Sequence, residues 1–319
     1  MKGQILFSAP FDFLPEDLKA AYNEYAPTTF REIWKREELA RDESITAWVM
    51  NPGQNFVIDA AVLDLFPNIE VLSTPSTGTN HINLDVCKAR GVPVYSLLDN
   101  RNILNSISAS AEFSFLLLLN TLRRLDFAIG EASSGRWRAG EDQMRGFELA
   151  GKKVGLVGYG RIGKRLARWC QAFDADVVFF DPYVEANENA AKVDSLERVF
   201  SESDIVCVCC VLTDETRGMI GTELLSLLKD RASLVNTSRG EVINEKELAQ
   251  LLDSRPDLRV GLDVIAGEVS GAQYDSPLFR FQEMGQIVIT PHIAGATFES
   301  QSKAALGALE LLKQHYSDL

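Results

Sequence analysis

The chain has 319 residues, of which 46% are hydrophobic and 24% charged, a composition typical of a globular protein long enough for two domains. Its formal net charge of −13, without a basic cluster, argues against nucleic acid or an anionic membrane surface as a partner. The first residues lack a signal-peptide pattern, and the longest nearly unbroken apolar run, residues 113–119, is too short to cross a bilayer. We therefore expect a soluble, cytoplasmic protein.

Short apolar runs alternate with helical patterns along the chain. In chain order, the runs that predict strands are residues 4–8, 45–50, 70–75, 93–97, 153–158, 176–181, 204–211, 233–238, 259–265 and 287–290. Continuous apolar strands separated by helices are typical of parallel sheets covered on both faces, so we expect an α/β fold of doubly wound sheets. Residues 106–124, leucine-rich and ending in two arginines, predict a helix.

The five cysteines show no metal-binding pattern. Cys207, Cys209 and Cys210 share one predicted strand, but no C-x-x-C spacing or neighbouring histidine accompanies them. We expect them to pack as small hydrophobic side chains, and we predict no metal site. An odd number of irregularly spaced cysteines also fits a reducing compartment.

A glycine motif stands in residues 153–163, KVGLVGYGRIG, directly after a predicted strand and before a helical pattern. Gly158 would permit a tight turn, Gly160 would let the backbone approach a pyrophosphate, and Gly163 would allow close packing of helix on strand. The helix N-terminus would offer its N–H groups to the phosphates. Asp181 ends the next strand, where an acid can accept hydrogen bonds from ribose hydroxyls and repel a 2′-phosphate. We therefore predict NAD rather than NADP as the cofactor.

Polar residues suited to hydride transfer follow three later strands: Arg239, then Asp263 with Glu268, then His292 in TPHIAGAT. Arginine can bind a carboxylate and polarise a neighbouring carbonyl, and histidine can donate a proton to an oxygen that becomes an alkoxide. A carboxylate beside the histidine favours its protonated form. Each residue alone could be an ordinary buried or solvated side chain. Their joint occurrence after a dinucleotide motif favours reduction of a 2-oxo acid.

These motifs together resemble one protein family. The matching segments are STGTNHINLD, ELAGKKVGLVGYGRIG, LTDETRGMI, LVNTSRGEVINEKEL, GLDVIAGE and TPHIAGAT, which run from Ser76 to Thr297. The chain resembles the D-isomer-specific 2-hydroxyacid dehydrogenases, which include phosphoglycerate, glycerate, glyoxylate/hydroxypyruvate and D-lactate enzymes. The resemblance implies a Rossmann NAD-binding domain, residues 99–290, inserted into a flavodoxin-like substrate domain made of residues 1–98 and 291–319.

The resemblance also implies residue roles. Arg239, Glu268 and His292 would be catalytic, with His292 the acid in reduction and the base in oxidation. Cofactor contacts would come from Gly158, Gly160, Arg161, Ile162, Gly163, Asp181, Thr213, Asp263 and Gly295. Among these, Arg161 and Ile162 would face the pyrophosphate and Asp263 the nicotinamide amide. Substrate contacts would come from Asn51, Thr77, Gly78, Thr79 and Arg239, with backbone N–H groups of residues 77–79 on the carboxylate. A homodimer would form through the helix near residues 106–124 and the segment after it.

Two alternatives and several departures stay open. Formate dehydrogenases look similar but carry glutamine where Glu268 stands, which favours 2-oxo acid reduction here. A corepressor branch of the family binds dinucleotides without this chemistry. Cys209 and Val211 replace a histidine and a proline that many members have. Residues 97–107 form a longer stretch than in many members, and its Arg101 could reach the substrate or be solvated. Hydroxypyruvate or glyoxylate is the substrate that we expect first.

Overall fold

A computed structural model describes residues 3–138, 141–185 and 189–317, and the chain forms two compact units. The first contains residues 1–107, 268–271 and 296–319, and the second contains residues 108–267 and 272–295. The chain thus leaves the first unit after residue 107 rather than after residue 98, and returns after residue 295 rather than 290. The first shift has a packing reason, since Leu97, Leu104 and Ile107 bury their side chains with Ala304 of the last helix.

The first unit is built on a five-stranded parallel sheet in the order β2-β1-β3-β4-β5, the flavodoxin-like order. Its strands are β1 (Gln4–Phe7), β2 (Thr28–Phe30), β3 (Ile45–Val49), β4 (Val71–Ser73) and β5 (Val94–Tyr95). Its helices are α1 (Glu16–Tyr25), α2 (Ala60–Leu63), α3 (Leu84–Ala89), α4 (Arg101–Ser106) and α13 (Phe298–Ser317), with 3₁₀ turns η1 (Arg36–Glu38), η2 (Leu97–Asp99) and η4 (Glu268–Ser270).

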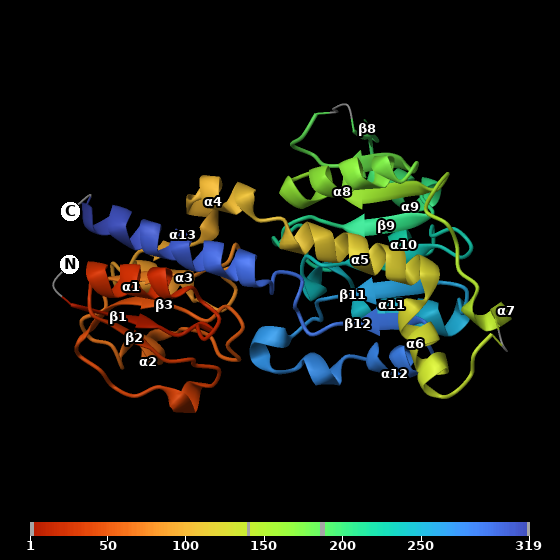
Figure 1. The fold of residues 1–319 in the computed structure, drawn as a ribbon. Helices are drawn as coiled ribbons and strands as arrows, with labels where there is room; N and C mark the ends of the chain where they lie inside the picture. Colours follow the sequence, from red (N-terminus) through yellow and green to blue (C-terminus); the bar gives the residue numbers. More distant parts are fainter. Residues whose placement is uncertain (1–2, 139–140, 186–188, 318–319) are drawn as a thin grey trace. The chain divides into compact units, whose positions relative to one another are not determined.

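Both faces of this sheet are buried. On one face α13 packs beside α1, and the Tyr22 hydroxyl donates to the carbonyl of Ala305 at 2.6 Å (Figure 1). On the other face Trp48 and Phe66 pack together in a second cluster. The last helix therefore completes a unit that begins at the other end of the chain.

The second unit contains a seven-stranded parallel sheet in the order β12-β11-β10-β9-β6-β7-β8, a Rossmann order extended by one strand. Its strands are β6 (Lys153–Val157), β7 (Asp176–Phe180), β8 (Ala191–Lys192), β9 (Ile205–Val208), β10 (Ser233–Asn236), β11 (Arg259–Leu262) and β12 (Ile287–Ile289). Its helices are α5 (Ala109–Arg123), α6 (Leu125–Ser133), α7 (Glu141–Met144), α8 (Arg161–Ala172), α9 (Leu196–Glu202), α10 (Thr222–Leu225), α11 (Glu245–Ser254) and α12 (Phe279–Glu283), with 3₁₀ turns η3 (Gly240–Val242) and η5 (Gln273–Asp275).

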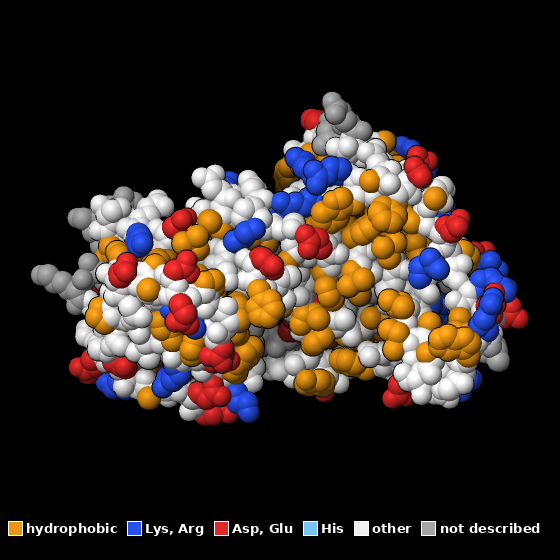
Figure 2. All heavy atoms as spheres, viewed as in Figure 1, with side chains coloured by type: hydrophobic (Ala, Val, Ile, Leu, Met, Phe, Trp, Pro, Cys, Tyr) orange, Lys and Arg blue, Asp and Glu red, His pale blue; other side chains and the backbone are white. Residues whose placement is uncertain are grey.

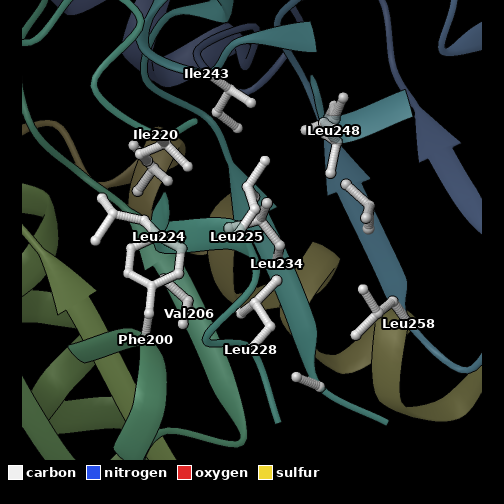
Figure 3. Close-up of a cluster of buried hydrophobic side chains, with 14 of the residues drawn as sticks. Phe200, Val206, Ile220, Leu224, Leu225, Leu228, Leu234, Ile243, Leu248 and Leu258 are labelled. Carbon is white, nitrogen blue, oxygen red and sulfur yellow. The ribbon is translucent and has the colours of Figure 1, made fainter. Parts of the chain in front are cut away.

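Successive residues of the central strands enter two different cores, which explains why these strands are apolar throughout. Val206 of β9 joins Phe200, Leu224 and Leu234 in one cluster (Figure 3), while Cys207 enters the cluster on the opposite face. Every predicted run forms a strand, and the predicted α/β fold is confirmed. The sequence patterns missed β2 and β8, short strands at sheet edges that bury little apolar surface.

The helix predicted over residues 106–124 begins later, at Ala109, because residues up to Ser106 form the separate helix α4. Within the described ranges, residues 101–123 are the one segment apolar and long enough by composition to cross a membrane. Ile107 and Ser108 interrupt that segment, and α5 packs on α8, β10 and β11. We read α5 as a core helix of the second unit.

Candidate active site

The glycine loop joins β6 to α8. Gly158 has a φ of +94°, and a Cβ there would lie 2.8 Å from the backbone nitrogen of Cys210. A Cβ on Gly163 would lie 2.5 Å from the carbonyl oxygen of Gly158. Around Gly160, in contrast, no described atom lies within 4 Å of such a Cβ. Local packing therefore requires glycine at two positions, and the third borders the space where a pyrophosphate would approach the N-terminus of α8.

Asp181 directly follows β7 and lies against this loop. Its carboxylate accepts hydrogen bonds from the backbone N–H groups of Tyr159 (2.8 Å) and Tyr183 (2.9 Å). The Gly158 N–H donates to the carbonyl of Phe180, which ties the loop to the end of β7. Each carboxylate oxygen can accept a further bond. The position suits the predicted contact with ribose hydroxyls.

Positive charge gathers at the start of α8. Burial, with the neighbouring Arg165, lowers the pKa of Arg161, which still leaves a charged guanidinium at neutral pH. Ile162 packs partly against the core under this helix. Two arginines beside the positive end of a helix favour a bound anion such as a pyrophosphate.

The loop after β9 carries the cysteines and Thr213. Burial raises the pKa of the Cys207, Cys209 and Cys210 thiols, that of Cys210 to about 11, so they stay protonated at neutral pH. In the part of the chain that the structure describes, no three histidine, cysteine or acidic side chains are placed to hold a metal ion. Thr213 is exposed, and its N–H donates to the hydroxyl of Thr216 at 2.7 Å, which closes the turn.

Arg239 lies in a tight turn organised by Asn236, the last residue of β10. The Asn236 amide donates to the Arg239 carbonyl and accepts from the N–H and hydroxyl of Ser238, each at 2.9 Å. A Cβ on Gly240 would lie 2.1 Å from the carbonyl carbon of Ile265, so the turn packs directly on the segment after β11. Asn236 was not predicted as a functional residue, although an amide at a strand end is a recognisable turn signal.

Asp263 follows β11, is 1% exposed, and holds the turn that carries His292. Its carboxylate accepts from the Thr290 hydroxyl (2.6 Å) and from the N–H groups of Ile293 (2.9 Å) and Ala294 (2.7 Å). Its carbonyl accepts the His292 N–H at 2.8 Å. His292 has a φ of +54°, a strained conformation for a residue with a side chain. Burial raises the pKa of Asp263, and these bonds and the nearby His292 partly oppose that shift.

The turns of Arg239, Asp263 and His292 follow β10, β11 and β12, which are consecutive in the sheet. The Asp263 N–H donates to the carbonyl of Asn236 at 2.9 Å, so the first two turns are directly linked. The structure thus brings these predicted residues to one edge of one sheet. Gly295 closes the same turn as His292, and both are exposed.

Glu268 begins η4, in the four-residue segment 268–271 that is counted with the first unit. Glu245, the first residue of α11, fixes the chain on both sides of this segment. Its carboxylate accepts from the Ala266 N–H and the Ser276 hydroxyl, both at 2.6 Å. Glu245 was not predicted, because an acid at a helix N-terminus is common and indicates no particular contact.

In the first unit, residues 77–79 follow β4, with Thr77 exposed and Gly78 and Thr79 partly buried. The Ser76 hydroxyl donates to the Gly78 carbonyl at 2.8 Å and contacts the Thr74 hydroxyl at 2.9 Å. Among the described residues, no acceptor is in place for the backbone N–H groups of Thr77, Gly78 and Thr79. Three neighbouring N–H groups of this kind can bind a carboxylate.

Asn51 and Arg101 are the other two residues of this unit that the sequence analysis considered for the substrate. Asn51 is 1% exposed, and its amide donates to the Ile33 carbonyl (3.0 Å) and accepts the Gly53 N–H (2.9 Å). Its side chain is thus committed to the turn after β3, which argues against the predicted substrate contact. Arg101 is exposed at the start of α4. That helix is anchored on α13, where the Lys303 ammonium donates to the Ser106 carbonyl at 2.9 Å.

Comparison with known proteins agrees with this architecture. The family model of the D-isomer specific 2-hydroxyacid dehydrogenase, NAD binding domain, matches residues 115–294. A glyoxylate reductase of Pyrococcus furiosus is 32% identical over 283 residues, which cover 86% of this chain and 80% of that protein. The chain therefore belongs to the D-isomer specific 2-hydroxyacid dehydrogenase family, and the predicted resemblance is confirmed.

The similar proteins also include longer enzymes and solved structures. The D-3-phosphoglycerate dehydrogenase of Mycobacterium tuberculosis is 33% identical over 259 residues, or 80% of this chain and 47% of that protein. The chain thus spans about half the length of the D-3-phosphoglycerate dehydrogenases that it matches. The crystal structure of a Thermus thermophilus protein, 27% identical in sequence, superimposes with a TM-score of 0.82. The match covers 96% of this chain and 94% of that protein's chain.

Proposed function

We propose that this protein transfers a hydride reversibly between NADH and C2 of a small 2-oxo acid, giving a D-2-hydroxy acid. The observation that carries the proposal is the placement of Arg239 and His292 on either side of Asp263, at the carboxyl edge of one parallel sheet. Sheets of this kind bind their ligands at that edge. The names of the relatives, glyoxylate reductase among them, support the same reaction class.

NAD fits the residues around the glycine loop. Gly160 leaves room for a pyrophosphate at the N-terminus of α8, and Arg161 adds positive charge there. Asp181 would accept bonds from the ribose hydroxyls and repel a 2′-phosphate, which favours NAD over NADP. NADH supplies the hydride in reduction, and NAD receives it in oxidation. Faster turnover with NADPH than with NADH at equal concentration would contradict this preference.

The protein's own residues would bind the substrate and move its proton. The Arg239 guanidinium would bind the carboxylate of the substrate and polarise its C2 carbonyl. His292 would donate a proton to the carbonyl oxygen as the hydride reaches C2, and would take that proton back in oxidation. Glu268 is the third residue to which the family resemblance gives a catalytic role.

Formate dehydrogenase activity is the second candidate, and the glutamate at position 268 disfavours it. Formate oxidation transfers a hydride without protonating the substrate, so it does not need a carboxylate that favours an imidazolium. Glu268→Gln should therefore change the pH profile of 2-oxo acid reduction, and formate oxidation should be absent. An unchanged pH profile in a folded Glu268→Gln variant would remove Glu268 from the proton transfer.

The proposal is tested by NADH consumption with glyoxylate, hydroxypyruvate, phosphohydroxypyruvate, pyruvate and bulkier 2-oxo acids. We expect turnover on at least one of them, and its loss in His292→Ala. His315→Ala is the matched control, because His315 lies on α13 and contacts Tyr95. NADH binding without turnover, together with a co-purifying protein partner, would instead support a corepressor-like role.

We further propose a cytoplasmic homodimer that forms through the α5–α6 region. Hydrophobic side chains gather over α5 and α8 in Figure 2. The exposed apolar residues of these elements include Leu116 of α5 (51% exposed) and Phe173, which follows α8 (49%). Leu125 and Ile129 of α6 are more than half exposed as well. Burying such a patch between two copies is favourable. Light scattering should give the mass of a dimer, and Ile129→Glu should shift it toward the monomer.

A further inference from the structure

In the turn after β4, two backbone carbonyl groups are bound to the protein. The Leu97 N–H, from the segment after β5, donates to the Ser76 carbonyl at 2.9 Å, and the Ser76 hydroxyl donates to the Gly78 carbonyl at 2.8 Å. These peptides are trans, so the carbonyl and the N–H of each peptide point in opposite directions. The N–H groups of Thr77 and Thr79, which complete the two peptides, therefore point away from the donors that hold the carbonyls.

A chain of three polar side chains fixes the Gly78 carbonyl. The Ser76 hydroxyl lies 2.9 Å from the Thr74 hydroxyl, which lies 3.3 Å from Nε2 of His81. A hydroxyl has one hydrogen to donate. Because Ser76 donates its hydrogen to Gly78, Thr74 must donate to Ser76, and Nε2 of His81 must carry the hydrogen that Thr74 accepts. Donation therefore runs in one direction, from His81 through both hydroxyls to the Gly78 carbonyl.

The start of this chain is buried and anchored. His81 is 1% exposed and Thr74 is 0% exposed. The His81 carbonyl accepts the Ile58 N–H at 2.9 Å, and the N–H of the next residue, Ile82, donates to the Thr79 carbonyl at 2.9 Å. Since water does not reach the buried groups, removing the imidazole donor would leave the Thr74 oxygen without a replacement. The orientation of the turn thus depends on His81, which lies outside it.

We infer that His81 is a positioning residue, which acts through Thr74 and Ser76 to hold the Thr79 N–H in the direction where it binds an oxygen of the substrate carboxylate. The inference rests on the proposed function, which supplies a 2-oxo acid as the anion. Residues 74–83 contain no lysine or arginine, so this turn can offer an anion only its backbone N–H groups. The chain ends on a neutral carbonyl, so His81 orients the turn and exchanges no proton with the substrate.

The test compares kcat and KM for a 2-oxo acid in the wild type, Ser76→Ala and His81→Phe. We expect KM to rise about 10-fold in both variants with kcat nearly unchanged, because the lost contact is made equally in the ground and transition states. His81→Gln returns an N–H donor and should restore most of the wild-type KM. Ser73→Ala is the matched control, because Ser73 of β4 is 0% exposed and no described residue bonds its hydroxyl. It should leave KM unchanged.

Binding of oxamate, an unreactive amide with the shape of pyruvate, separates this inference from the proposed reaction. In the presence of NADH, Ser76→Ala should bind oxamate about 10-fold more weakly than the wild type. That result without any turnover would support the positioning role and refute the reaction. Turnover with unchanged KM and oxamate affinity in Ser76→Ala, or equal KM in His81→Phe and His81→Gln, would overturn the inference alone. A wild-type protein that neither turns over nor binds oxamate would overturn both.

Discussion

Replacing Asp263 with asparagine would show whether this residue acts through the His292 turn. The asparagine oxygen can still accept from Thr290 and Ile293, but its NH2 group would face the Ala294 N–H, which loses its acceptor. An unsatisfied buried donor costs about 1–3 kcal/mol. Removing a carboxylate whose burial is itself unfavourable offsets part of this cost. We therefore expect the free energy of unfolding to fall by about 1–2 kcal/mol.

The effect on turnover should be larger than the effect on stability. The left-handed conformation of His292 costs about 1–3 kcal/mol and depends on the bonds that Asp263 accepts. A displacement of about 1 Å in a reacting group can lower the rate on the order of 10²-fold. We expect a loss of this size in kcat for 2-oxo acid reduction, with the NADH dissociation constant close to that of the wild type.

Two assays decide the role of Asp263: steady-state NADH consumption for kcat and a fluorescence titration for NADH affinity. Thr290→Val is the graded control, because it removes one of the three bonds that the carboxylate accepts and should lower kcat less. Unchanged kcat in folded Asp263→Asn would refute the positioning role. Weaker NADH binding with unchanged kcat would instead assign Asp263 to the nicotinamide amide, as the family resemblance implies.

Further predictions concern the glycines and one ion pair. Gly158→Ala should lower both the melting temperature and the NADH affinity, because the φ of +94° and the close backbone exclude a Cβ. Gly160→Ala should weaken only NADH binding, because no described atom lies near its Cβ position. Equal effects of the two substitutions on the melting temperature would contradict this difference. The methyl group of Gly240→Ala would lie 2.1 Å from a carbonyl carbon. This substitution should lower the free energy of unfolding in urea by about 1–3 kcal/mol or more, and should also lower kcat. A variant as stable as the wild type would contradict the close packing at Gly240. The Arg255 guanidinium holds the pKa of Asp257 well below its usual range, so the pair stabilises the fold above about pH 4, and this contribution is lost as the pH falls. Asp257→Asn should thus lose about 1 kcal/mol at neutral pH and little in acid, and a pH-independent loss would disprove the linkage.

Regular structure was largely predictable from the sequence, because parallel strands with two buried faces are apolar without interruption. β9 is the clearest example, with Val206 and Cys207 entering cores on opposite faces of the sheet. The two strands that were not predicted, β2 and β8, have only three and two residues and lie at the edges of their sheets. The helix break at residues 107–108 was not predicted either. It depends on the packing of α4 on α13, a contact between distant parts of the chain.

The sequence by itself determined the family, the glycine loop and the types of residue at the strand ends, because motif spacing and strand periodicity are local properties. Only the tertiary structure showed which polar side chains already make hydrogen bonds within the protein. The Asn51 amide makes hydrogen bonds with Ile33 and Gly53 around its own turn. Gln54, three residues later, has a buried Oε1 that no described donor reaches. Likewise, only the pairing of β11 with its neighbours places Asp263 under the strained turn of His292. These hydrogen-bond partners follow strands that are far apart in the chain. The order of the strands in the sheet determines which of them meet, and no local sequence pattern encodes that order.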